Sequence, residues 1–123
     1  MKNIKNKFTT LKVDFEEYSP IYYNIGKDAI GNDQILEIAK NTDLWFHLKD
    51  RTSSHVIASI PKDIEEDFLE EIIKKGALLC KEHSKYKDYY NLEIIYTNVI
   101  NVEKPKRANA GTVIANNTKI ILC

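Results

Sequence analysis

The stretch that decides the fold is LWFHLKDRTSSHVIASI, residues 44–60. Its two ends, residues 44–48 and 55–60, are rich in aromatic and β-branched side chains, whereas residues 49–54 between them are polar. This pattern predicts two strands joined by a hairpin or another tight connection. Pro61 ends the second strand, because proline has no amide hydrogen to donate to a neighbouring strand.

A long helix is predicted directly after this pair, where residues 63–80 read DIEEDFLEEIIKKGALLC. Asp63 followed by Glu66 is typical of a capping box, so we expect the helix to begin there. Acidic residues at its start and lysines at its end complement the helix dipole. Its apolar residues recur at helical spacing and predict one buried face; they are Ile64, Phe68, Leu69, Ile72, Ile73, Ala77, Leu79 and Cys80.

Shorter patterns complete the fold. Asn32 is expected to cap a short helix that ends near residues 41–43, and Asn116-Asn117 is expected to close a hairpin between the last two strands. Residues 104–111 read as an irregular basic loop. The sequence therefore predicts an α+β fold, a mixed or antiparallel β-sheet with one short and one long helix packed on it. The remaining strands are expected at residues 11–15, 21–25, 92–96, 112–115 and 119–122.

The composition predicts one globular domain over residues 1–123, with residues 1–19 carrying the fewest signals. With 43% apolar and 29% charged residues, the chain is too apolar for disorder and too often interrupted by charge for a membrane span. The lysine-rich start, residues 1–7, is not followed by a signal-type apolar core, so we expect a cytosolic protein. Cys80 and Cys123 are the only cysteines, which predicts neither a disulfide framework nor a cysteine zinc site, and no cofactor.

Charge limits the kind of polyanion binding that is possible. Lysine and arginine number 18, as do aspartate and glutamate, so no global field attracts nucleic acid to the chain. Any nucleic-acid surface must be a local patch, and binding by the domain alone is expected to be weak or assisted.

Several short motifs occur in an order that resembles one family. Gly26-Lys27-Asp28, with Asn32-Asp33 after it, precedes Asp43-Leu44-Trp45-Phe46-His47. Ser54-His55-Val56 and His83-Ser84-Lys85 follow on either side of the long helix. The segment Tyr96-Thr97-Asn98-Val99, with Val102 and Lys104-Pro105, completes the set. Over residues 20–123 the chain is similar to the NFACT-R domain of NFACT proteins, which act in ribosome-associated quality control, here as a nearly stand-alone domain.

The resemblance implies a non-catalytic RNA-binding module. Its partner would be tRNA, ribosomal RNA or the ribosome, with a separate quality-control chain as a further candidate. Two departures concern the family's motifs: Ser53 replaces a glycine, and Arg107-Ala108-Asn109-Ala110-Gly111 replaces a G-A-K-P-G loop and loses its lysine. The residues expected to contact RNA are Lys27, Asp43, Trp45, His47, Arg51, Ser54, His55, Lys85, Lys104, Lys106 and Arg107.

Trp45 and the histidines admit two interpretations. Alternation along a strand places Trp45 and His47 opposite Leu44, Phe46 and Leu48, so either the tryptophan or the aliphatic set faces the core. A buried tryptophan is the commoner case, and a stacking surface for a base is the alternative. His47 and His55 come close if their strands pair.

Two competing hypotheses follow from the same residues. Asp43, His47 and His55 suggest a small metal-dependent or histidine-dependent nucleic-acid hydrolase, although a third convergent metal ligand is missing from the pattern. The chain is otherwise a protein-interaction adaptor on the ribosome or a DNA-binding module. Metal analysis distinguishes the hydrolase, and salt-dependent RNA binding distinguishes the adaptor.

Overall fold

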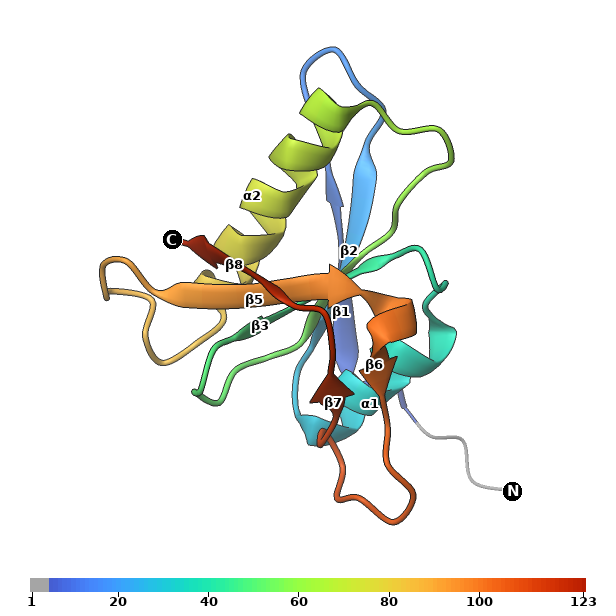
Figure 1. Cartoon of the computed structure of the whole chain (residues 1–123), viewed down its shortest axis with the longest axis vertical. Helices are drawn as coiled ribbons and strands as arrows, with labels where there is room; N and C mark the ends of the chain where they lie inside the picture. The colour runs from blue at the N-terminus through green and yellow to red at the C-terminus, as the bar shows by residue number, and fades with distance from the viewer. Residues whose placement is uncertain (1–4) are drawn as a thin grey trace.

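A six-stranded antiparallel sheet forms the centre of the fold (Figure 1). The computed structural model describes residues 5–123, so the first four residues of the lysine-rich start lie outside the described part. Neighbouring strands follow the order β1-β2-β4-β3-β5-β8, and every pair is antiparallel. The predicted α+β class is confirmed. The strands are β1 Phe8–Val13, β2 Ile21–Gly26, β3 Leu44–Leu48, β4 Val56–Ala58, β5 Glu93–Asn98 and β8 Lys119–Leu122.

The hairpin predicted from residues 44–60 lies in the middle of this sheet. β3 and β4 pair antiparallel, with Trp45 opposite Ile57, and β3 pairs on its other side with β5. Both strands are therefore flanked on both sides, and neither lies at an edge of the sheet.

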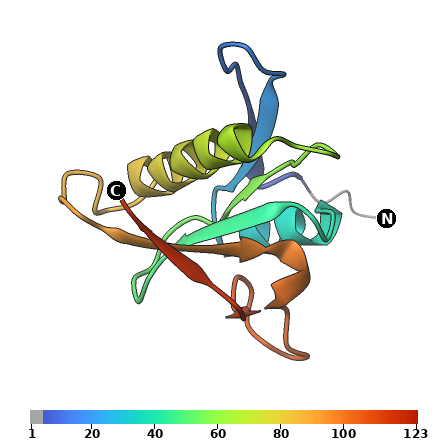
Figure 2. The same cartoon turned by 45° about the horizontal axis from the view of Figure 1, so that its top comes forward.

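The two helices cover opposite faces of the sheet. The helix α2, Glu66–Glu82, packs on the face that carries Phe46, while α1, Ala29–Ile38, packs on the face that carries Trp45 and Ile57. Figure 2 shows α2 lying across the strands. The prediction that either Trp45 or the aliphatic set would face the core was therefore too narrow, because both faces of β3 are covered by a helix.

The starts of both helices differ from the prediction. Asp28, not Asn32, caps α1, and its Oδ1 accepts a hydrogen bond from the Gly31 amide at 2.8 Å. Asn32 lies inside the helix instead. In α2 the N-cap is Glu65 and no side chain caps it, so the predicted capping box is wrong. Asp63 has a φ of 55° and belongs to the turn before the helix, which removes it from capping distance.

The predicted C-terminal hairpin is also wrong. The strand β7, Ile114–Ala115, pairs with β6, Val102–Glu103, in a separate two-stranded sheet, whereas β8 crosses to pair with β5. The Asn116 amide donates to the Asn101 carbonyl at 2.8 Å, which holds the connecting segment against the 3₁₀ helix Val99–Asn101 instead of letting it turn back. The predicted basic loop 104–111 joins β6 to β7 and projects at the bottom of Figure 1.

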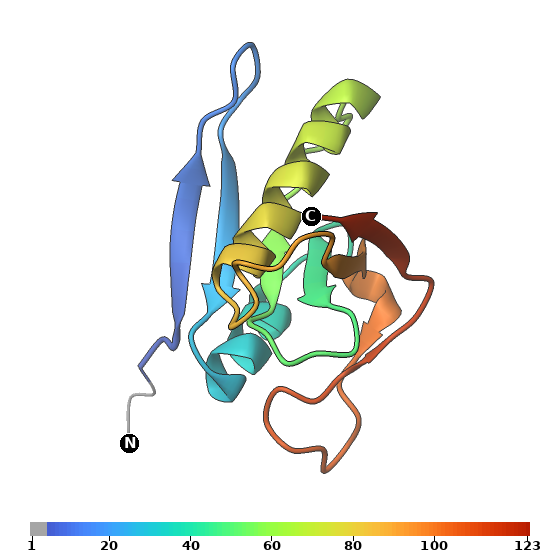
Figure 3. The ribbon, with the colours of Figure 1, turned by 90° about the vertical axis from the view of Figure 1, so that its left-hand side faces the viewer.

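The β1–β2 hairpin extends past the rest of the sheet, beside the first turns of α2 (Figure 3). β1 begins and ends earlier than predicted, at Phe8 and Val13. Within residues 5–123, no helix has the length and apolar character needed to cross a membrane.

Candidate nucleic-acid interface

An open cleft of about 460 Å³ lies where four connecting segments meet. These segments are the turn between β2 and α1, the link between β3 and β4, the end of α2, and the β6–β7 loop. The structure brings five predicted residues together here, from segments far apart in the sequence: Lys27, His47, Ser54, His55 and Lys85.

The first turn of α1 forms one wall of the cleft. Lys27, Asp28 and Ala29 line it and are exposed, so the positive end of the helix dipole faces the cleft. Gly26 precedes them because a Cβ there would lie 1.9 Å from Oδ1 of Asn32. That same Oδ1 accepts from the His55 amide at 3.0 Å, which fixes α1 against the start of β4.

Trp45 and two histidines form the floor of the cleft and the layer beneath it. Trp45 is 2% exposed, and its Nε1 donates to Nδ1 of His55 at 3.1 Å. An indole nitrogen can only donate, so His55 carries its own proton on Nε2. The ring of His47 stacks on Trp45 and lies edge-on to His55, with 5.0 Å between the two imidazole centroids.

His47 has the opposite tautomer. Its Nδ1 lies 2.6 Å from the Leu48 carbonyl, which can only accept, so Nδ1 carries the proton and Nε2 of the neutral ring is an acceptor. Within residues 5–123 every buried side-chain nitrogen and oxygen has a hydrogen-bond partner. Neither histidine Nε2 bonds to another group of this described part, so both nitrogens reach the surface of the cleft.

Burial keeps both imidazoles neutral. It lowers the pKa of His55 to about 3, with a smaller contribution from the neighbouring His47. Burial also lowers the pKa of His47, opposed by the hydrogen bond to the Leu48 carbonyl, which raises it. At neutral pH the floor of the cleft therefore presents one N–H donor, from His55, beside one nitrogen acceptor, from His47.

Asp33 ties the β6–β7 loop to α1. Its Oδ1 accepts from the Gly111 amide at 3.0 Å and lies 3.2 Å from Nζ of Lys104. Gly111 has a φ of 80° and packs against Ala29, where a larger residue would be strained. Lys104 is therefore held in an ion pair, while the other two predicted cations of the loop, Lys106 and Arg107, are exposed.

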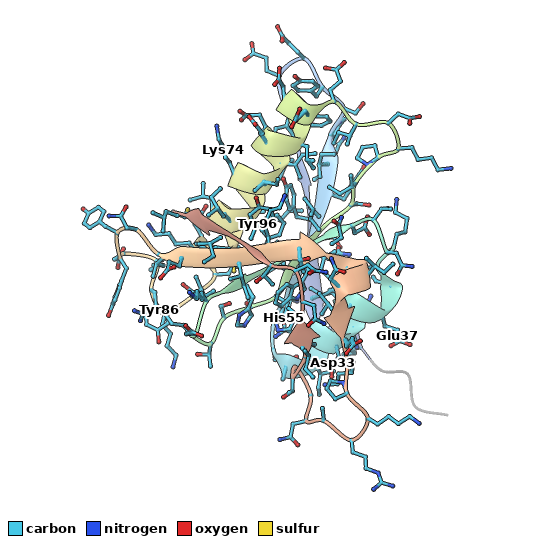
Figure 4. All side chains as sticks on the ribbon, in the orientation of Figure 1. Asp33, Glu37, His55, Lys74, Tyr86 and Tyr96 are labelled. Carbon is cyan, nitrogen blue, oxygen red and sulfur yellow. The ribbon has the colours of Figure 1, made fainter. Side chains whose placement is uncertain are left out.

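Arg51, in the link between β3 and β4, does not line the cleft and lies over aromatic rings. Its guanidinium carbon is 4.5 Å from the ring centroid of Tyr86 and 5.5 Å from that of Tyr89. The two tyrosines contact each other edge to face, and Tyr86 also packs against the core. Figure 4 shows Tyr86 away from His55, toward the loop between α2 and β5. A guanidinium on an aromatic ring keeps one face free for stacking.

Six predicted residues do not line the cleft: Asp43 and Trp45 are buried, and Arg51, Lys104, Lys106 and Arg107 are exposed elsewhere. Asp43 is 4% exposed; its Oδ1 accepts from the Ile60 amide at 3.0 Å and its Oδ2 from the Lys40 amide at 2.9 Å. Asp43 thus joins the start of β3 to the segment before it and to the segment after β4, and it does not contact the histidines. Trp45 is a core residue that positions His55. No group of three or more His, Cys, Asp and Glu side chains in residues 5–123 is arranged to hold a metal ion.

Sequence reasoning took Asn32 for a helix cap and did not include Asn32 or Asp33 among the site residues, although both anchor the cleft. The signal was present, since both follow Gly26-Lys27-Asp28 in the motif quoted above. One turn of helix places Asn32 toward His55 and Asp33 toward the β6–β7 loop, a consequence that spacing alone does not reveal.

The comparisons with known proteins agree with this geometry. The family model described as "NFACT protein RNA binding domain" matches residues 12–117. The Rqc2 homolog RqcH of Bacillus subtilis is 31% identical over 80% of this chain and 17% of its own length. The coiled-coil domain-containing protein 25 homolog of Dictyostelium discoideum is 30% identical over 77% of this chain and 47% of its own length, and its Mus musculus relative is 29% identical over 86% and 50%.

A solved structure has the same fold. It is described as the C-terminal of the fibronectin/fibrinogen-binding protein from Streptococcus suis, with a TM-score of 0.78 and 24% identity over 99% of this chain and 46% of that one. This chain spans half or less of the length of these curated relatives. Because the family model covers residues 12–117, which include the cleft, its two histidines and the basic loop, the chain belongs to the NFACT RNA-binding domain family.

Proposed function

We propose that this domain is a non-catalytic RNA-binding module whose RNA surface is the cleft together with the exposed part of the β6–β7 loop. The observation that carries the proposal is the family match over residues 12–117. The cleft supports it, because it combines exposed cations with hydrogen-bonding groups of neutral side chains, the two kinds of contact that RNA needs.

The cations are placed for contacts with a phosphate backbone. Lys27 and Lys85 both line the cleft, one from just before α1 and the other from beyond the end of α2. Lys106 and Arg107 extend the positive surface on the adjoining loop, and Ser54 adds a hydroxyl. Phosphate contacts of this kind supply affinity and position without selecting a sequence.

The RNA partner we propose is tRNA or ribosomal RNA on a ribosome engaged in quality control. RqcH is named as an Rqc2 homolog and is far longer than this chain, which matches 17% of it. A separate quality-control chain is a further proposed partner. A domain with a net charge of zero is well suited to such assisted binding, since its own field is weak.

A salt titration tests the proposal. We expect Lys27→Ala with Lys85→Ala to weaken binding of a single-stranded RNA and to reduce the slope of log K against log salt by about 1.4, since each lost phosphate contact removes about 0.7. The measurement is fluorescence anisotropy at several salt concentrations. The slope is more informative than the affinity because it counts the counterions released.

The matched control removes the same charge elsewhere. Lys12→Ala with Lys62→Ala changes two exposed lysines that do not line the cleft, one on β1 and one before α2. This control should keep the parent slope. Identical slopes for the parent and the cleft variant, with unaltered thermal unfolding, would refute the cleft as the RNA surface. A parent that binds no RNA would favour the protein-interaction adaptor, and RNA cleavage lost on metal removal would favour the hydrolase.

A further inference from the structure

The floor of the cleft presents two nitrogens of opposite character. Nε2 of His55 is a donor because Trp45 occupies Nδ1, and Nε2 of His47 is an acceptor because the Leu48 carbonyl occupies its Nδ1. The rings lie 5.0 Å apart and nearly perpendicular, and His55 itself is 3% exposed. Neither Nε2 has a hydrogen-bond partner among residues 5–123, so each is available to a ligand.

A phosphate group does not match this pair. Phosphodiester oxygens only accept hydrogen bonds, so they can pair with His55 but leave the acceptor of His47 facing another acceptor. The ligand group between the two rings must therefore donate as well as accept. A hydroxyl does both with a single oxygen, and the ribose 2′-hydroxyl is such a group in every nucleotide of RNA.

We propose that the His47–His55 pair binds a ribose 2′-hydroxyl, which donates to Nε2 of His47 and accepts from Nε2 of His55, so that the cleft selects RNA over DNA. This inference rests on the proposed function, because it names the group of RNA that the same cleft reads. The surrounding cations agree with it: a ribose lies between two phosphates, and Lys27 and Lys85 line the same cleft as the histidine pair.

The fixed tautomers make the selection robust. The indole N–H of Trp45 holds Nδ1 of His55 and the Leu48 carbonyl holds Nδ1 of His47, and turning either ring over would break its hydrogen bond. The Asn32 side chain fixes the backbone of His55 in addition. A preorganised donor and acceptor lose little conformational entropy when the ligand binds.

The test compares three oligonucleotides of one sequence: oligouridylate, its 2′-deoxy form, and its 2′-O-methyl form, which still accepts but cannot donate. We expect the unmodified RNA to bind about 2- to 12-fold more tightly than either analogue, the range that one net hydrogen bond supplies. The bases are identical in all three, so donors on the base edge cannot produce the difference.

His47→Phe assigns the preference to the pair. The phenyl ring retains a flat surface to stack on Trp45 and removes both ring nitrogens. We expect RNA affinity to fall to the level of the deoxy form, while affinity for the deoxy form and the salt slope stay at the parent values. The cationic variant Lys27→Ala with Lys85→Ala should show the reverse, with weaker binding of all three oligonucleotides and an unchanged ratio between them.

Each contrary outcome has a distinct meaning. If the parent binds RNA and the deoxy form equally and with a strong salt slope, the inference is overturned while the proposed function stands. The same follows if the 2′-O-methyl form binds as well as RNA, or if His47→Phe keeps the preference. If the parent binds none of the three, the proposed function fails and the inference fails with it. The oligonucleotide series needs no variant, so it decides even if His47→Phe does not fold.

Discussion

At the scale of single residues, the cleft depends on a buried histidine that is neutral at physiological pH. His55 receives a hydrogen bond from Trp45 on its ring and donates its backbone amide to Asn32. A protonated ring would have two donors, and its Nδ1–H would face the indole N–H of Trp45. Burial lowers the pKa of His55 to about 3, and the hydrogen bond from Trp45 favours the same neutral form.

This lowered pKa predicts a loss of stability in mild acid. Below pH 6.5 the unfolded chain binds a proton at His55 but the folded chain does not until about pH 3. The free energy of unfolding should therefore be at its full value above pH 6.5 and fall by about 1.4 kcal/mol for each pH unit below it. The lowered pKa of His47 adds a loss of the same sign. Urea denaturation at pH 7.5 and pH 5.5 measures the difference before most carboxylates titrate.

Two histidine variants serve as controls for this prediction. His55→Gln removes the titrating group, so its stability should vary less between the two pH values, whatever its absolute value. His83→Gln removes an exposed histidine and should retain the parent dependence. Equal losses of stability in the parent and in His55→Gln would show that His55 is not the group responsible.

At the scale of elements, α2 is set unusually close to the sheet. Gly76 lies in its middle, and a Cβ built there would come within 2.3 Å of the Phe46 ring on β3. Glycine in a helix interior costs about 1 kcal/mol relative to alanine. The chain accepts that cost because the missing side chain lets the Phe46 ring, which is completely buried, pack directly against the helix backbone.

We expect Gly76→Ala to destabilise the protein, although the same change stabilises an exposed helix. Overpacking of a core typically costs about 1–3 kcal/mol, more than the helix propensity returns. Thermal or urea denaturation shows whether Gly76→Ala raises or lowers the free energy of unfolding. The pair Gly76→Ala with Phe46→Leu supplies the control, because removing the ring gives the new methyl group room: in the Phe46→Leu background the alanine should cost less or stabilise. A stabilising effect in the parent background would contradict the close approach.

Local patterns predicted the elements whose partners are near in sequence. The hairpin of residues 44–60 and the stripe that buries Phe68 and Ile72 depend on periodicity alone, and both are confirmed. The predicted C-terminal hairpin was wrong because β8 pairs with β5, and this pairing depends on the arrangement of the whole sheet. The predicted helix starts were wrong because capping depends on the turn before the helix; before α2, Asp63 in that turn has a left-handed conformation.

The site was predictable to the same degree. Motif order identified His47, His55, Lys27 and Lys85, which the structure brings into one cleft. It also included Trp45, because strand alternation does not reveal that a second helix covers that face. The expectation that His47 and His55 would be close is confirmed. The tautomers depend on contacts between separate strands and were beyond reach of the sequence.

At the scale of the whole molecule, zero net charge conceals a separation of charge. Acidic side chains surround a second hollow at the start of α2 and the β1–β2 loop; they are Glu16, Glu17, Asp67, Glu70 and Glu71. The cleft lies beyond the other end of this 17-residue helix, about 25 Å away. If the cleft is the RNA surface, we expect this charge distribution to orient the RNA although it adds little net attraction.

The cleft also joins the two halves of the chain, since Asp33 of α1 holds the β6–β7 loop through Gly111 and Lys104. Asp33→Ala removes the acceptor for the Gly111 amide and the partner of Lys104. Charge alone predicts tighter RNA binding by this variant, because a carboxylate beside the site is lost. We expect weaker binding, because the loop that carries Lys106 and Arg107 is no longer held, and we expect faster amide hydrogen exchange over residues 104–112.

Asp33→Asn separates these two effects. The amide oxygen of asparagine can still accept from Gly111 while the negative charge is gone, so this variant should bind RNA at least as tightly as the parent and keep the slow exchange of the loop. Anisotropy titrations and hydrogen exchange by mass spectrometry give the two readouts on the same samples. If Asp33→Ala and Asp33→Asn both bind more tightly, only the charge of Asp33 matters and the anchored loop is no part of the RNA surface. If RNA affinity falls in Asp33→Ala and does not fall in Asp33→Asn, RNA binding needs the C-terminal loop fixed on the N-terminal helix.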